Sequence, residues 1–62
     1  MITPIDTENL VKASQRASLL AADLRTLAQS ADPFLAELAV EMLKVAAELE
    51  QKLKRLTTAT SV

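Results

Sequence analysis

The chain is 62 residues long, which limits it to one small domain. Half of its residues are hydrophobic and 24% are charged, and it contains no Gly and two Pro, a composition that favours helices and excludes intrinsic disorder. The formal net charge of -1 gives no overall attraction to nucleic acid or to an anionic membrane. The lack of Cys and His excludes disulfides, thiol nucleophiles and imidazole chemistry.

The first helix is predicted over residues 4–29. Thr3 can cap its amino end, Pro4 suits the first helical position because its missing N–H is not needed there, and Asp6 complements the helix dipole. Apolar residues then recur at alternating intervals of three and four, the spacing of a helix-bundle seam. The predicted seam of this helix contains Leu10, Ala13, Ala17, Leu20, Leu24 and Leu27.

The strongest break in the chain is the segment Ser30-Ala31-Asp32-Pro33. Pro33 disfavours helical geometry at Asp32, so Asp32 is predicted to cap a new helix that starts at Pro33. We therefore expect a turn at residues 30–32.

The second helix is predicted over residues 33–56, followed by a frayed tail at 57–62. Its apolar residues follow the same spacing of three and four. The predicted seam of this helix contains Leu35, Leu38, Met42, Val45, Leu49, Leu53 and Leu56.

Two near-equal helices joined by a short turn predict an all-α fold in which residues 1–62 form a single antiparallel hairpin. A lone hairpin of this size buries too little apolar surface to offset the entropy lost on ordering its residues. We therefore expect two hairpins to pack as an antiparallel homodimer, forming a four-helix bundle, or to build a higher oligomer.

The second helix carries more apolar surface than one neighbouring helix can cover. Phe34, Val40 and Leu43 are the candidate partner surface. Such a surface can hold an amphipathic helix of another protein in a groove. The alternative is that these are ordinary exposed apolar side chains, which folded proteins also contain.

Charge placement along the hairpin favours an antiparallel dimer. Acidic side chains gather toward the turn, whereas five of the seven basic residues lie at the open end. An antiparallel dimer lays the acidic end of one copy beside the basic end of the other, although the same charges also serve simply to solvate the surface. The basic residues at the open end are Lys12, Arg16, Lys52, Lys54 and Arg55.

No constellation of residues predicts catalysis. Glu37 and Glu41 share a helix face, but the chain has no His to complete a bundle metal site and no imidazole base for its serines. We expect no catalytic residue, cofactor or metal, hence a non-enzymatic protein. The sequence also shows no signal peptide and no apolar run of roughly 20 residues, so we expect a cytoplasmic protein without a membrane span.

The two near-equal helices and the turn containing Ala31-Asp32 resemble the Rop-like RNA-binding regulators, which form antiparallel four-helix bundles. This resemblance implies RNA contacts from the outer face of the first helix, where Lys12, Gln15 and Arg16 are of matching type. No aromatic residue accompanies them, and Phe34 lies far away beside the turn. Nucleic-acid binding is therefore not the first expectation, and an RNA-binding regulator stays an alternative. Its candidate nucleic-acid contacts are the basic residues of the open end, Lys12, Arg16, Lys52, Lys54 and Arg55.

The segment from Ser30 to Ala36 resembles the turn between the two helices of type III secretion needle subunits. This resemblance implies a chaperone or structural subunit that completes its bundle with a different protein. The first expectation remains a small protein-protein interaction or regulatory protein that acts as an antiparallel homodimer.

Overall fold

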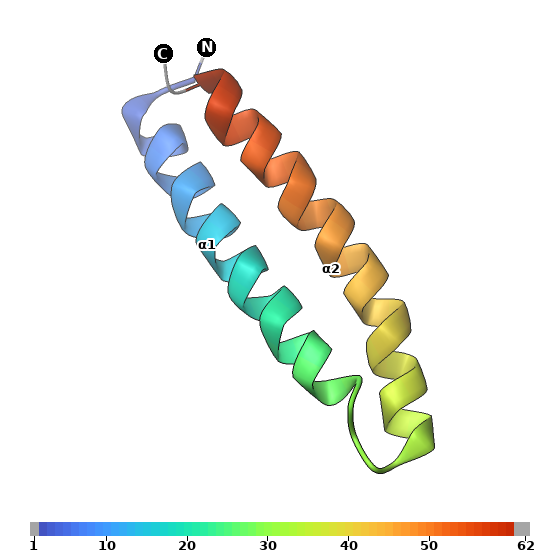
Figure 1. The fold of residues 1–62 in the computed structure, drawn as a ribbon. Coiled ribbons are helices and arrows are strands. Elements are labelled where there is room, and N and C mark those ends of the chain that lie inside the picture. The colour runs from blue at the N-terminus through green and yellow to red at the C-terminus, as the bar shows by residue number, and fades with distance from the viewer. Residues whose placement is uncertain (1, 61–62) are drawn as a thin grey trace.

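The computed structural model describes residues 2–60 and shows two helices, α1 (Pro4–Leu27) and α2 (Pro33–Thr60), packed side by side as an antiparallel hairpin (Figure 1). The predicted all-helical hairpin is confirmed. The molecule is a rod of 45 × 14 × 14 Å with a radius of gyration of 14.2 Å. A compact globule of the same length would have a radius of gyration of about 10.6 Å, so most side chains stay near the surface.

The amino end of α1 is fixed by a capping box. The backbone N–H of Asp6 donates to Thr3 Oγ1 at 3.1 Å, and the N–H of Thr3 donates to Asp6 Oδ2 at 3.2 Å. These bonds satisfy two donors that a helix otherwise leaves unpaired at its start. At the other end α1 stops at Leu27 rather than at residue 29, because the N–H of Gln29 bonds back only three residues, to the carbonyl of Thr26.

Asp32 caps α2, and its Oδ1 accepts a hydrogen bond from the N–H of Leu35 at 3.0 Å. The helix continues to Thr60, four residues beyond the predicted end at residue 56. The Thr57 hydroxyl donates to the Leu53 carbonyl at 2.8 Å. Because this bond reaches back four residues along the same helix, the side chain does not pull the backbone into a turn. The rest of the predicted tail, 61–62, lies outside the described residues.

The two helices meet along small side chains. The buried residues are Ala17, Ala21 and Leu24 of α1 with Ala39 and Ala46 of α2. Half-buried residues continue the same spacing of three and four along each helix, and we call the whole set the seam. Its members are Thr7, Leu10, Ser14, Ala17, Ala21 and Leu24 of α1, Ala28 directly after α1, and Ala36, Ala39, Leu43, Ala46, Glu50, Leu53, Thr57 and Thr60 of α2.

The contact inside the hairpin includes only part of the predicted bundle seam. Most predicted seam residues lie one position before a seam residue and are exposed. Alanine at the contact lets two helix backbones approach closely, and the larger side chains next to it are then turned outward. Ala17 and Leu24 are buried and Leu10 and Leu53 are half-buried, whereas Ala13, Leu20, Leu27, Leu35, Leu38, Met42, Val45, Leu49 and Leu56 are exposed.

Candidate interaction surface

The exposed members of the predicted seams form a second apolar stripe on each helix. We call this surface the open face. Its α2 part repeats at intervals of three and four, with Lys52 in the one position that is not apolar. The open face consists of Ala13, Leu20 and Leu27 of α1 with Leu35, Leu38, Met42, Val45, Leu49 and Leu56 of α2.

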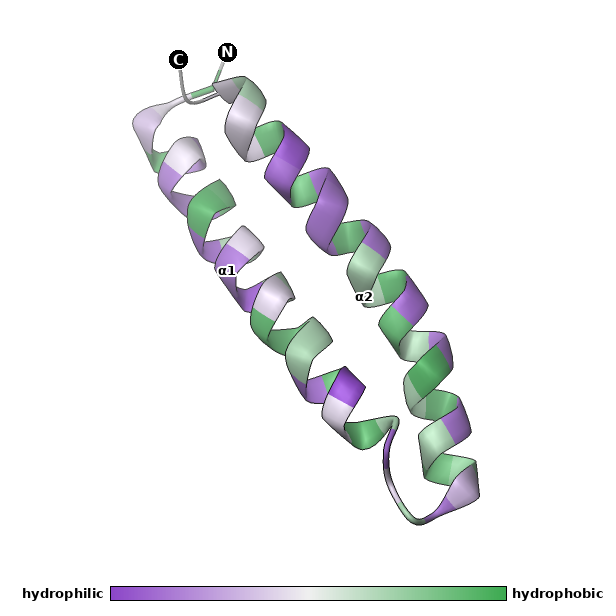
Figure 2. Cartoon of the chain, viewed as in Figure 1, coloured by the Kyte–Doolittle hydropathy of each residue, from purple (hydrophilic) through white to green (hydrophobic). Residues whose placement is uncertain are grey.

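A groove of about 330 Å³ shows that the stripes of α1 and α2 lie on the same side of the hairpin. Its walls are apolar and come from both helices, and its floor reaches the seam. The side chains that line it are Leu20, Leu24, Met42, Val45, Ala46 and Leu49. Figure 2 shows that the half of α2 nearest the turn is mostly hydrophobic, while its hydrophilic residues concentrate toward the carboxyl end.

Each helix thus has two stripes that contain apolar residues, and that of the open face on α1 is interrupted by Arg16 and Asp23. At 100° per residue, the stripe of the open face lies roughly 100° around the helix from the seam, because its residues come one position earlier. A helix in a square four-helix bundle needs two contact stripes about 90° apart, because it packs against two neighbours. Only the seam stripe is covered within the hairpin.

The hairpin also exposes more surface area than a compact protein of the same mass. The hairpin exposes 4874 Å². A compact protein of 6.7 kDa is expected to expose about 3,900 Å², so this chain exposes roughly 1,000 Å² in excess. One partner of a standard protein-protein interface buries about 800 Å². The excess is therefore of the size that a stable interface requires.

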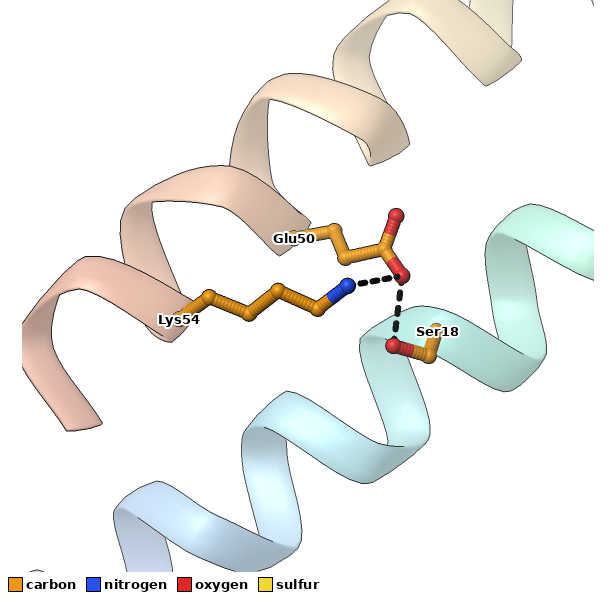
Figure 3. Close-up of polar contacts among 3 residues, drawn as sticks. All are labelled: Ser18, Glu50 and Lys54. Atoms are coloured by element: carbon orange, nitrogen blue, oxygen red, sulfur yellow. Dashed lines mark hydrogen bonds and ion pairs between the residues drawn. The ribbon is translucent and has the colours of Figure 1, made fainter. Parts of the chain in front are cut away.

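A polar contact also links the two helices at the seam residue Glu50 (Figure 3). The Ser18 hydroxyl donates a hydrogen bond to Glu50 Oε2, and Lys54 Nζ lies 3.5 Å from the same oxygen. Ser18 holds the pKa of Glu50 below its usual range, mainly through this hydrogen bond; partial desolvation opposes the shift and the charge of Lys54 assists it. The contact joins α1 to α2 without using the open face.

The five basic residues at the open end do not form one free cluster. Lys12 pairs with Glu8 at 3.3 Å and Lys54 pairs with Glu50, both within their own helix. Among the described residues, Arg16, Lys52 and Arg55 are exposed and form no ion pair. Fewer unpaired basic side chains are therefore available to bind the phosphates of a nucleic acid.

The structure separates the three residues predicted as a partner surface. Leu43 packs against the cluster of Ala21, Leu24 and Ala46, so it belongs to the seam. Phe34 is exposed beside the turn, and Val40 is exposed on the flank of the seam opposite the open face. Leu43 packs between the two helices because its neighbours in the seam of α2, Ala39 and Ala46, are small and leave room for one larger side chain.

Sequence reasoning missed the alanine contact and the bond between Ser18 and Glu50. The spacing of three and four from Ala36 to Thr60 was an available signal, since it is as regular as the predicted repeat. Choosing the most hydrophobic repeat selected the open face instead.

Comparison of the chain with protein-family models, with curated proteins and with solved structures finds no match. In residues 2–60, neither helix combines the length and the apolar composition that crossing a membrane requires. Within the same residues, no three acidic side chains form a group that could hold a metal ion. The function is therefore inferred from the open face.

Proposed function

We propose that this protein is a non-enzymatic interaction protein that associates with a second copy of itself through the open face. The product is a homodimeric four-helix bundle with the two turns at opposite ends. The observation that carries the proposal is the pair of apolar stripes on each helix, of which the hairpin covers one.

The small size of the hairpin core supports the proposal. Four of its five buried side chains are alanines, and among the described residues no large side chain is fully buried. Alanine burial removes little apolar surface from water, so the stability that a folded chain of this length needs has to come from elsewhere. Covering the open face removes leucine, methionine and valine side chains from water.

A helix from a different protein is the second candidate for the open face. The groove that runs between α1 and α2 favours it, because an amphipathic helix binds in such a groove with apolar residues at intervals of three and four. The protein would then act as a chaperone or structural subunit. Its action in the cytoplasm stays a prediction in both cases.

A matched pair of substitutions on α2 tests the proposal. Val45 on the open face is 66% exposed in the hairpin, and Val40 on the opposite flank is 44% exposed. If the hairpin were the whole functional unit, Val40→Glu would be the more damaging change because Val40 is the more buried. If the open face is covered in solution, Val45→Glu is the more damaging, because it places a charge in an apolar contact.

The readout is the mass of each purified variant by sedimentation equilibrium, with helicity by circular dichroism as the control for folding. We expect a dimeric parent, a dimeric Val40→Glu variant and a monomeric or unfolded Val45→Glu variant. A parent chain that is folded and monomeric would contradict self-association. If that monomer instead gains mass with an amphipathic partner helix and Val45→Glu prevents it, the second candidate is correct.

A further inference from the structure

Two charged residues of opposite sign interrupt the open stripe of α1. The stripe runs Ala13, Arg16, Leu20, Asp23, Leu27, with the same intervals of three and four as the apolar stripe of α2. Arg16 and Asp23 are exposed, and neither forms an ion pair within the described part of the chain. Each of them directly precedes a buried seam residue of α1, just as Val45 directly precedes Ala46 on α2, and Val45 lines the groove.

The bond between Ser18 and Glu50 fixes which residues of the two helices lie at the same height. Arg16 is two residues before Ser18, and Lys52 is two residues after Glu50. Because the helices are antiparallel, Arg16 and Lys52 lie at the same height near the open end. By the same count Asp23 lies at the height of Val45, beside the groove.

We propose that a second copy lies on the open face with its turn at the opposite end, and that Arg16 of each copy pairs with Asp23 of the other. The proposal rests on the self-association proposed above. In this arrangement α1 packs on α1 of the second copy and α2 packs on α2, related by a two-fold axis. The two-fold symmetry makes the Arg16–Asp23 pair occur twice.

The lengths of the helices give the register. Full overlap of two α2 helices (Pro33–Thr60) puts the two-fold axis near residues 46 and 47, which lie at the height of residues 21 and 22 of α1. Arg16 then lies about one helical turn, roughly 6 Å along the axis, from Asp23 of the second copy. A side chain as long as arginine spans this distance. In the same register Val45 of one copy lies beside Leu49 of the other.

The opposite orientation brings like charges together. If the two turns lay at the same end, α1 would pack on α2 of the second copy without a change of height. Arg16 would then lie beside Lys52 of the second copy, twice, and Asp23 would face the uncharged Val45. Like charges across an interface disfavour that arrangement, and opposite charges favour the first.

Charge reversal distinguishes the two orientations. We expect Arg16→Glu and Asp23→Arg each to raise the dimer dissociation constant by about 10- to 30-fold, because two attractive pairs become repulsive in each variant. The double variant Arg16→Glu/Asp23→Arg exchanges the two charges and should return to within about threefold of the parent. Sedimentation equilibrium at low salt measures each constant, and circular dichroism verifies that each variant is folded.

Mixing the two single variants gives the sharpest readout. At a concentration where each single variant is mostly monomeric, an equimolar mixture should form a heterodimer, because both of its cross-copy pairs are again opposite in charge. With the turns at the same end, Arg16→Glu would instead tighten the dimer by pairing with Lys52, and Asp23→Arg would have little effect.

The possible failures are separable. A parent that is monomeric overturns the proposed self-association and this pairing together. A dimeric parent whose single variants keep the parent dissociation constant overturns the Arg16–Asp23 pair alone. A dimeric parent whose Arg16→Glu variant binds more tightly overturns both the pair and the placement of the two turns at opposite ends, while self-association stands.

Discussion

The hydroxyl of Ser18 on α1 donates a hydrogen bond to the carboxylate of Glu50 on α2, in a position where the neighbouring seam residues are Ala46 and Leu53. The Glu50 side chain is only 16% exposed, and its carboxylate needs a partner to offset its partial desolvation. Ser18 and Lys54 supply that partner from both helices. The contact also fixes the height of one helix against the other, which an alanine seam by itself specifies weakly.

The bond predicts a specific dependence of stability on pH. The pKa of Glu50 is lowered in the folded chain relative to its value near 4.3 in unfolded chains, so the ionised form stabilises the fold. This stabilisation is present above the unfolded pKa and is lost as the pH falls through the lower folded pKa. Ser18→Ala removes the main cause of the shift. We expect the variant to be less stable than the parent at pH 7 and the difference to disappear in acid.

Urea unfolding at pH 7, 4 and 3 measures this difference in the free energy of unfolding. Ser14→Ala is the matched control, because Ser14 is also a half-buried serine in the seam and the structure records no bond from it to a carboxylate among the described residues. A parent and a Ser18→Ala variant that differ equally at all three pH values would contradict the assigned role of Glu50.

The alanine contact predicts that larger residues in the seam are harmful. Ala21 is fully buried against Leu24 and Ala46, so Ala21→Leu forces the helices apart and should cost about 1 to 3 kcal/mol of unfolding free energy. Ala22→Leu makes the same change at an exposed position and should alter stability by less than about 0.5 kcal/mol. Equal stability of the two variants in chemical denaturation would show that the seam is elsewhere.

The helices and their caps were predictable because they depend on local chemistry. Thr3, Asp32 and Pro33 act within a few residues of their own position, and no distant contact alters what a capping oxygen or a proline ring does. The end of α2 was less predictable, since the threonine-rich segment after Leu56 has low helix propensity. In that segment the chain is helical despite its low propensity, and the Thr57 hydroxyl bonds to the Leu53 carbonyl.

The face of each helix that meets the other was not predictable from hydrophobicity. Both helices carry two regular stripes one residue apart, and the repeat of Leu35, Leu38 and Met42 is the more hydrophobic of the two on α2. The sequence pattern indicates that both stripes need covering but not which neighbour covers which. Within the hairpin, α1 and α2 approach each other closely through Ala39 and Ala46, and the larger residues of the other stripe stay exposed.

The basic end makes a prediction about nucleic acid. With Lys12 and Lys54 held by acidic residues of their own helix, we expect no binding to structured RNA tighter than about 1 µM at physiological salt. Fluorescence anisotropy against a paired RNA stem at rising salt measures it. Tighter binding that weakens steeply with salt, and that is lost on reversing Arg16 and Arg55, would instead support an RNA-binding regulator.

Three leucine-to-alanine variants separate the seam from the open face. Leu24 is 6% exposed in the seam, so Leu24→Ala should cost about 2 to 5 kcal/mol and lower the melting temperature at every protein concentration. Leu38 is 38% exposed on the open face, so Leu38→Ala should act through weaker association. Its melting temperature should therefore depend more strongly on protein concentration than that of the parent, because dimerisation stabilises the folded state by mass action.

Leu19 lies outside both stripes and is exposed, so Leu19→Ala is the control of the same chemistry. Thermal melts over a hundredfold range of protein concentration give the comparison. If Leu38→Ala melts like Leu19→Ala at all concentrations, nothing covers the open stripe of α2 in solution. If Leu38→Ala is the only one of the two that loses stability, and loses most at low concentration, Leu38 is buried between copies even though the hairpin leaves it exposed.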